Sequence, residues 1–209
     1  RTKQGCARLT RERQRSGSHA ELHPLGGKSK KMEMDLLNHW LWSFCFSPDD
    51  STAAFRSSPE DIDVYDLGGR TRKCRFNEMG LRQARLNSNG TCLATVATRA
   101  LTDTSGQITL AFRDTTSGNE ISKISLSDVT AMEFVPGRDS LLTGSVSGDI
   151  RAWLPGHERV LWEMRPHSTR VVAIVYSLAG IGGADGACRA SVLYEDGLVW
   201  VCDPETGSE

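Results

Sequence analysis

The sequence lacks any long apolar run. Its longest apolar stretch, residues 171–183, is shorter than the about 18 residues that a membrane-spanning helix needs. No charged segment followed by an apolar segment, the pattern of a secretory signal, is visible either. We therefore predict a protein that is intracellular and not bound to a membrane.

Cysteine is sparse and irregularly spaced. None of the six cysteines belongs to a CxxC pair; they are Cys6, Cys45, Cys74, Cys92, Cys188 and Cys202. Small secreted scaffolds use denser cysteine patterns. We expect reduced, mostly buried thiols, in agreement with a location in the cytoplasm or nucleus.

Complete nucleotide-binding motifs are also missing. Residues 27–29 (GKS) resemble the end of a phosphate-binding loop, but the glycine required five residues earlier is replaced by Leu22. The glycine-rich residues 180–186 would have to open a helix, whereas residues 187–194 alternate like a strand. The sequence predicts no cofactor.

Residues with metal-binding or catalytic chemistry do not form recognisable sets. His19 and His23 lie four residues apart, but Pro24 interrupts the segment and no carboxylate or Cys partner follows. No Ser/His/Asp or Cys/His arrangement can be assembled. We predict no metal site and no catalytic residue, and therefore a protein that is not an enzyme.

Charge is unevenly distributed along the chain. Residues 1–31 hold nine Lys/Arg and two Glu, a net of +7, against sixteen basic and twenty-four acidic residues, a net of −8, in the remainder. We predict that residues 1–30 form a basic, disordered tail. Residues 1–31 could bind nucleic acid through phosphate contacts or remain solvated. They contain no aromatic residue for base stacking.

From Met32 onward, short apolar and β-branched runs alternate with turn residues. Similar first strands recur at residues 40–46, 81–86, 129–135 and 170–176. Second strands are predicted at 51–56, 91–98, 140–146 and 187–194, third strands at 62–67, 107–114, 149–154 and 197–203, and fourth strands at 70–76, 120–126 and 158–164.

A period of about 40 to 45 residues with four strands per unit is typical of β-propellers. The sequence predicts an all-β domain over residues 31–209, a β-propeller of four-stranded antiparallel blades. The four blades cover residues 39–76, 80–126, 128–164 and 168–207.

Short motifs recur within these units. They include FSPDD at residues 46–50, LTGS at 142–145, GDIRAW at 148–153, Tyr65-Asp66, Asn38-His39 and His167. These motifs resemble those of the WD-repeat family. That resemblance implies a rigid, non-catalytic scaffold for protein–protein interactions. Because Leu154 replaces the terminal Asp of the third unit, we expect the family's His–Asp hydrogen bonds to be incomplete.

The two ends of the repeat region suggest two arrangements. Residues 31–36 (KMEMDL) stand where an outer strand belongs, and the fourth unit stops after its third strand. Pairing of these segments would close a four-blade ring and remove exposed sheet edges. We instead favour part of a larger ring, with further blades after Glu209.

The resemblance also implies a binding surface on the wide face of the ring. Trp40 and Trp42 are expected near that face in the first unit, with Arg82 and Arg170 at matching positions in later units. Trp and Arg are frequent binding hot spots. We predict that Trp42, Arg82 and Arg170 contact a partner protein. The alternatives are a nucleic-acid-associated propeller and a propeller-type hydrolase, although the latter lacks a visible nucleophile.

Overall fold

The structure is a computed structural model. It describes residues 7–14, 17–24, 32–36, 44–98, 107–177 and 188–209. These residues form eighteen strands, β1 to β18, and no helix, which confirms the all-β prediction. The described part of the chain consequently contains no helix that is long and apolar enough to cross a membrane.

The strands form five antiparallel sheets. An N-terminal sheet contains β1 (Ala7–Gln14), β2 (Gly17–Pro24) and β3 (Met32–Leu36). The first sheet contains β4 (Phe44–Phe46), β5 (Thr52–Arg56), β6 (Asp61–Asp66) and β7 (Thr71–Asn77). The second contains β8 (Leu81–Leu86), β9 (Cys92–Thr98), β10 (Ile108–Asp114) and β11 (Glu120–Leu126).

The last two sheets differ in their number of strands. The third sheet contains β12 (Ala131–Phe134), β13 (Leu141–Gly144), β14 (Ile150–Trp153) and β15 (Trp162–Met164). The fourth contains only β16 (Val171–Ser177), β17 (Arg189–Tyr194) and β18 (Val199–Cys202). Each of these four sheets lies within one of the four repeat units of the sequence, and the observed strands coincide with the predicted ones apart from shifts at their ends.

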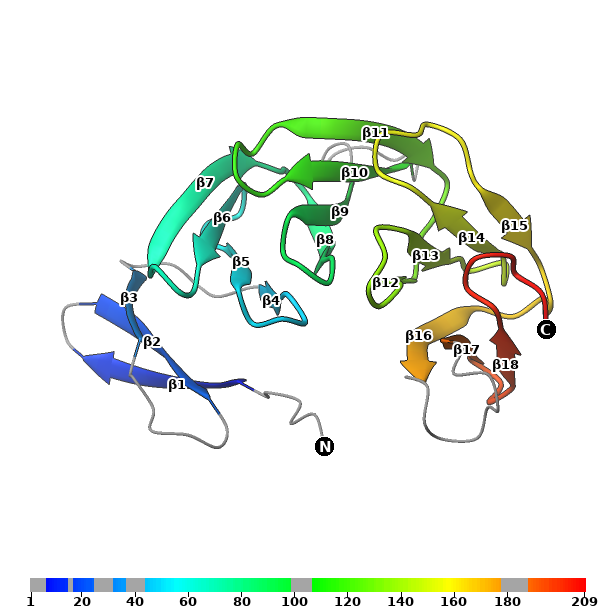
Figure 1. Cartoon of the computed structure of the whole chain (residues 1–209), viewed down its shortest axis with the longest axis horizontal. Helices are drawn as coiled ribbons and strands as arrows, with labels where there is room; N and C mark the ends of the chain where they lie inside the picture. The colour runs from blue at the N-terminus through cyan, green and yellow to red at the C-terminus, as the bar shows by residue number, and fades with distance from the viewer. Residues whose placement is uncertain (1–6, 15–16, 25–31, 37–43, 99–106, 178–187) are drawn as a thin grey trace.

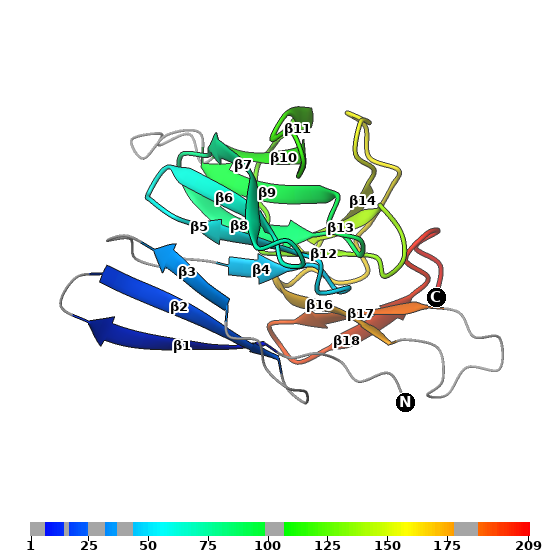
Figure 2. The same ribbon diagram turned by 60° about the vertical axis from the view of Figure 1, so that its left-hand side comes forward.

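The sheets follow one another along an arc (Figure 1). The leading strands β4, β8, β12 and β16 contact one another in sequence order. Their sheets fan outward from this inner row, as the turned view also shows (Figure 2). The arrangement is blade-like, but the arc is open, so the sheets do not form a closed ring (Figure 1).

Apolar side chains fill the space between neighbouring sheets. One cluster joins the first and second sheets through residues such as Val64 and Leu93. Another joins the second and third sheets through Phe112 and Trp153. A third, described below, joins the third and fourth sheets. Because central strands are covered on both faces, β9 and β13 are buried at nearly every position.

The N-terminal sheet differs from two expectations. Strands β1 and β2 pair over residues 7–14 and 17–24, where the sequence predicts a disordered tail. Strand β3 pairs with β2, and the closed four-blade ring in which residues 31–36 complete the fourth sheet is therefore wrong. Main-chain hydrogen bonds can form a ladder without the hydrophobic periodicity on which the sequence prediction relied.

Candidate protein-binding surface

The three residues predicted for partner binding are not joined by any described contact. Trp42 lies outside the described residues. Arg82 lies in β8 and Arg170 immediately precedes β16, and both side chains are exposed. Within the described part of the chain, neither guanidinium forms a hydrogen bond or an ion pair. Both side chains are therefore open to solvent.

Arg82 and Arg170 do not occupy matching positions. Leu81 and Val171 are buried residues that begin the pairing of their strands, and an irregular step in register follows each. Arg82 comes one residue after Leu81, and its counterpart is therefore Val172 rather than Arg170.

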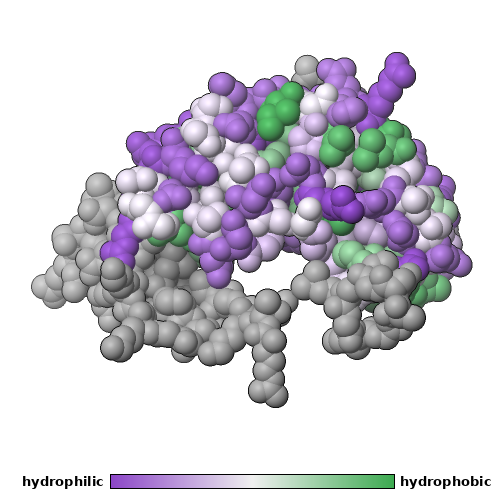
Figure 3. Space-filling model, in the orientation of Figure 1, coloured by the Kyte–Doolittle hydropathy of each residue, from purple (hydrophilic) through white to green (hydrophobic). Residues whose placement is uncertain are grey.

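The fourth sheet presents an apolar outer face. Val175, Leu193, Val199 and Val201 are 58%, 37%, 54% and 46% exposed. Cross-strand pairing places them on one face, because Val199 lies opposite Leu193, while Val175 and Val201 both lie opposite Ser191. Apolar surface is visible where this sheet ends the arc, at the lower right of Figure 3. We call these four residues the aliphatic face.

The opposite face of the fourth sheet is buried. Val192, Tyr194, Trp200 and Cys202 pack against the third sheet in one cluster. Burial raises the pKa of the Cys202 thiol to about 12. The fourth sheet is thus apolar on both sides, like a sheet with neighbours on both faces, yet in the described structure only one side is covered.

The turn before the third strand has the same geometry in the third sheet and in the fourth sheet. Gly148 and Gly197 lie at the same place in this turn, with φ angles of 88° and 89°. Each glycine N–H donates to the carbonyl three residues earlier, at 3.3 Å and 3.0 Å. Ile150 and Val199 each follow these glycines by two residues, so they occupy equivalent positions in the third strand of their sheets.

Equivalent positions on the two sheets have different surroundings. Ile150 and Ala152 are fully buried between the third and fourth sheets. Their counterparts, Val199 and Val201, lie on the exposed aliphatic face. The face that the third sheet buries against the fourth sheet is therefore exposed on the fourth sheet itself.

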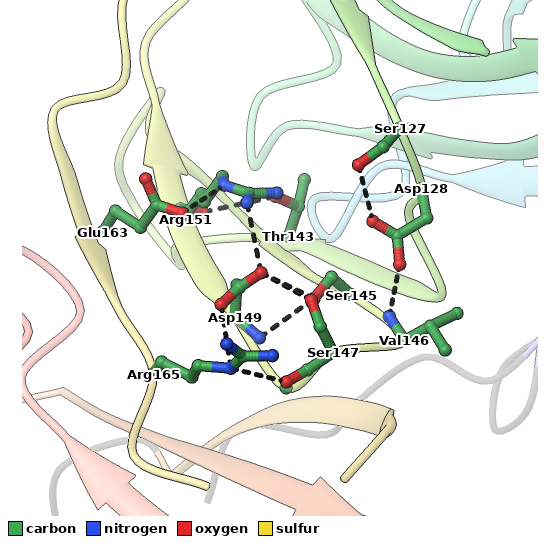
Figure 4. Close-up of polar contacts among 12 residues, drawn as sticks. Ser127, Asp128, Thr143, Ser145, Val146, Ser147, Asp149, Arg151, Glu163 and Arg165 are labelled. Atoms are coloured by element: carbon green, nitrogen blue, oxygen red, sulfur yellow. Dashed lines mark hydrogen bonds and ion pairs between the residues drawn. The ribbon is translucent and has the colours of Figure 1, made fainter. Parts of the chain in front are cut away.

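A carboxylate stabilises the turn of the third sheet (Figure 4). Asp149 accepts hydrogen bonds from the hydroxyls of Ser147 at 2.6 Å and Ser145 at 3.3 Å. It also pairs with Arg151 at 3.2 Å and Arg165 at 3.4 Å. Two hydroxyls and two guanidinium groups surround this carboxylate, which therefore stabilises the turn.

The corresponding turn of the fourth sheet is held by a histidine. His167 Nε2 lies 2.5 Å from Asp196 Oδ2, and the imidazole packs edge-on against Tyr194, with ring centres 5.2 Å apart. The hydrogen bond with His167, together with one from the Leu198 N–H, lowers the pKa of Asp196. His167 had been matched to the Gly-His position of a WD repeat, and it pairs here with the turn carboxylate.

The described residues contain no group of three or more His, Cys, Asp and Glu side chains that could hold a metal ion. The five described cysteines are unpaired. Burial raises the pKa of both Cys45 and Cys92 to about 12. These two thiols are therefore protonated at neutral pH and poorly suited to nucleophilic chemistry.

Comparison with known proteins gives a likeness of fold alone. No protein-family model and no curated protein matches the sequence. Among solved structures, the chain is similar to the computationally designed Ika4 protein, with a TM-score of 0.51 and 17% identity. The match covers 78% of this chain and 91% of the designed one. The likeness supports the sheet architecture and carries no function.

Proposed function

We propose that this chain is a propeller scaffold of the WD-repeat type that binds other proteins and catalyses no reaction. Its blade-like sheets would hold a docking surface in a fixed shape, so that a partner binds without ordering a flexible segment.

Two local features support the WD-repeat assignment. The indole N–H of Trp153 donates to Thr143 Oγ1 at 2.8 Å, which ties the third strand of that unit to its second. The His167–Asp196 contact ties the linker before the fourth sheet to the turn of that sheet. Thr143, Trp153 and His167 all belong to the motifs on which the WD-repeat resemblance rests.

The exposed aliphatic face is the observation that carries the binding proposal. Val175, Leu193, Val199 and Val201 form a contiguous apolar surface on a single sheet. Contiguous apolar patches mark interaction sites more often than scattered apolar residues do. Trp42, Arg82 and Arg170 remain a second proposed contact set on the same scaffold.

The test begins with the full chain as bait in a cell extract, followed by purification of each recovered protein. Binding is then titrated with purified components. We expect the triple change Val175→Ser/Val199→Ser/Val201→Ser to weaken binding by about tenfold or more, because it removes the apolar contact surface. Val146→Ser is the matched control, since Val146 is 55% exposed but lies in the turn of the third sheet.

A combined Trp42→Ala/Arg82→Ala/Arg170→Ala variant tests the second contact set in the same titration. If every purified partner binds both triple variants as tightly as the unchanged chain, the binding proposal fails. Labelling of the folded chain by a serine-reactive probe would contradict the non-catalytic part of the proposal.

A further inference from the structure

Residues 165–170 link the last strand of the third sheet, β15, to the first strand of the fourth sheet, β16. Exposure alternates along this linker: Ser168 and Arg170 are exposed, while His167 and Thr169 are partly buried. The hydroxyl oxygen of Thr169 is itself buried. Ser168 and Arg170 therefore share the solvent side of the linker.

The hydroxyl of Ser168 makes no hydrogen bond within the described part of the chain. The main-chain groups of residues 166–169 likewise form no hydrogen bond with the described backbone. Side-chain contacts hold the linker instead, among them the hydrogen bond between His167 and Asp196. A segment without main-chain hydrogen bonds opens at low cost in free energy, so an enzyme can draw Ser168 into its active site.

Arg165 stands three residues before Ser168. Its guanidinium donates to the Ser147 carbonyl at 2.9 Å and lies 3.4 Å from the Asp149 carboxylate, as Figure 4 shows. The Arg165 side chain is 55% exposed, and an ion pair this exposed contributes little to stability. A carboxylate of another protein can therefore replace Asp149. A large class of serine/threonine kinases selects its substrates through an arginine at this position.

The same spacing of arginine and hydroxyl occurs elsewhere, but in different surroundings. Within residues 44–98, 107–177 and 188–209, the pairs with this spacing are Arg85 with Ser88, Arg113 with Thr116, and Arg165 with Ser168. Ser88 is occupied, because its hydroxyl accepts a hydrogen bond from the Gly137 N–H at 2.7 Å. Arg113 is only 12% exposed and pairs with Glu78, so a kinase cannot reach it. Of these three pairs, the last alone combines an exposed arginine with a free hydroxyl.

Arg170 is placed to hold a phosphate on Ser168. Its guanidinium forms no hydrogen bond or ion pair within the described part of the chain, while its carbonyl is fixed by the Glu195 N–H at 2.9 Å. Two residues of chain span at most about 7 Å, a distance that the long arginine side chain bridges. The carboxylates of the facing turn, Glu195 and Asp196, repel a phosphate. A guanidinium, in contrast, forms strong charge-assisted hydrogen bonds with it.

We propose that Ser168 is phosphorylated by an arginine-selective serine/threonine kinase and that Arg170 then binds the phosphate. The kinase transfers the γ-phosphoryl group of ATP: its bond to ADP breaks, a bond to Ser168 Oγ forms, and the hydroxyl proton passes to the catalytic aspartate of the kinase. Phosphorylation would thereby occupy Arg170, a member of the second proposed contact set. That consequence alone rests on the proposed function, whereas the modification site does not.

The first test treats the folded full chain with magnesium, ATP and recombinant calmodulin-dependent protein kinase, an enzyme that selects arginine at this position. Mass spectrometry of the digested chain locates the phosphate. We expect it on Ser168 and not on Ser88 or Thr116, and Ser168→Ala should remove it. A synthetic peptide of residues 163–172 verifies that the kinase accepts the sequence.

Arginine variants test how the kinase recognises the site. Arg165→Ala should slow phosphorylation by about tenfold or more, because it removes the charge that the kinase binds, and Arg165→Lys should restore part of the rate. Arg159→Ala is the matched control, since Arg159 is exposed on the segment that leads into β15, and it should leave the rate unchanged. Thermal unfolding verifies that each variant is folded.

Phosphorus NMR of the phosphorylated chain tests the role of Arg170. The second pKa of a phosphoserine is ordinarily about 6, and a guanidinium that binds the phosphate lowers it by favouring the dianion. We therefore expect a higher phosphate pKa in Arg170→Ala than in the unchanged chain. Arg82→Ala, which also removes an exposed arginine that begins an inner strand, should leave this pKa unchanged.

Two results would overturn the modification site. These are no phosphate on Ser168 of the folded chain under conditions that phosphorylate the peptide, and equal rates for the unchanged chain and Arg165→Ala. An equal phosphate pKa in the unchanged chain and in Arg170→Ala would overturn the role of Arg170. None of these results affects the binding proposal, which depends on the serine variants of the aliphatic face and purified partners.

Discussion

Ile150 of the third sheet and Val199 of the fourth sheet occupy equivalent positions, yet Ile150 is fully buried and Val199 is 54% exposed. Both follow a turn with the same hydrogen bonds and both belong to the third strand of their sheet. The difference arises because the fourth sheet covers Ile150, whereas no described sheet covers Val199. This contrast underlies the docking surface proposed above.

The same contrast should appear in stability. We expect Ile150→Ala to lower the free energy of unfolding by about 2–5 kcal/mol, since it leaves a cavity between two sheets. Val199→Ala should change it by less than about 0.5 kcal/mol, because solvent already reaches that side chain. Urea unfolding followed by tryptophan fluorescence measures both. Equal losses for the two variants would mean that the aliphatic face is covered in solution.

The paired glycines allow a second comparison. Gly197→Ala should cost about 1 kcal/mol, because an L residue must adopt positive φ while nothing lies within 4 Å of the new Cβ. At Gly148 the Cβ would lie 2.1 Å from the His167 carbonyl oxygen. Gly148→Ala should therefore cost about 3 kcal/mol or more. Thermal unfolding of both variants measures the two losses in stability. Similar losses would contradict the close packing of Gly148 against the linker that contains His167.

Glu78 and Arg113 form a buried ion pair, which predicts non-additive mutations. Their side chains are 8% and 12% exposed, and Arg113 Nη2 lies 2.9 Å from Glu78 Oε2. Arg113→Met should cost about 3–5 kcal/mol because it leaves a buried carboxylate without its cation. The double variant Glu78→Gln/Arg113→Met should lose less than Arg113→Met alone. A double-mutant cycle in urea measures the coupling, and additive losses would refute it.

Asp63 predicts a pH dependence of stability. Burial disfavours its charged form, but the Arg75 guanidinium, 2.6 Å and 2.7 Å from its two oxygens, outweighs that effect and holds its pKa below the usual 3.8. Because the folded pKa is depressed, the stabilisation is complete above the unfolded pKa of about 3.9 and is lost as pH falls through the lower folded value.

Asp63→Asn removes this titration. We expect the variant to be about 1–2 kcal/mol less stable at pH 7, and the difference from the unchanged chain to shrink below about pH 4. Urea midpoints between pH 3 and pH 7 test the sign of the effect. Asp61→Asn serves as a control on the same strand, and a difference that grows toward low pH would contradict the argument.

The strands of the first to fourth sheets were predictable because their signals are local. In the third sheet, Leu142 and Thr143 precede a Gly148 turn and Trp153 ends the next strand. Such spacing favours a hairpin whatever its surroundings. The role of the Asp149 carboxylate was not predictable, because its ion-pair partner Arg165 comes from another segment that only the folded chain brings near.

The positions of the predicted contact residues depended on non-local structure. The offset between Arg82 and Arg170 becomes visible when the ladders align Leu81 with Val171, an alignment that hydrophobic alternation alone does not provide. The pairing of β3 with β2 likewise depends on which of several possible edges it meets. Strand propensity is a property of the segment, whereas the choice of partner strand is a property of the whole fold.

The sequence by itself determined the all-β class, the four repeat units and nearly all their strands, because alternation and turn residues act over a few neighbouring positions. Only the tertiary structure decided that the arc is open, that β3 belongs to the N-terminal sheet, and that Val199 is exposed while Ile150 is buried. An apolar strand has the same kind of sequence whether its face is buried or exposed. Whether their faces are buried or available for a partner depends on which sheets lie beside them.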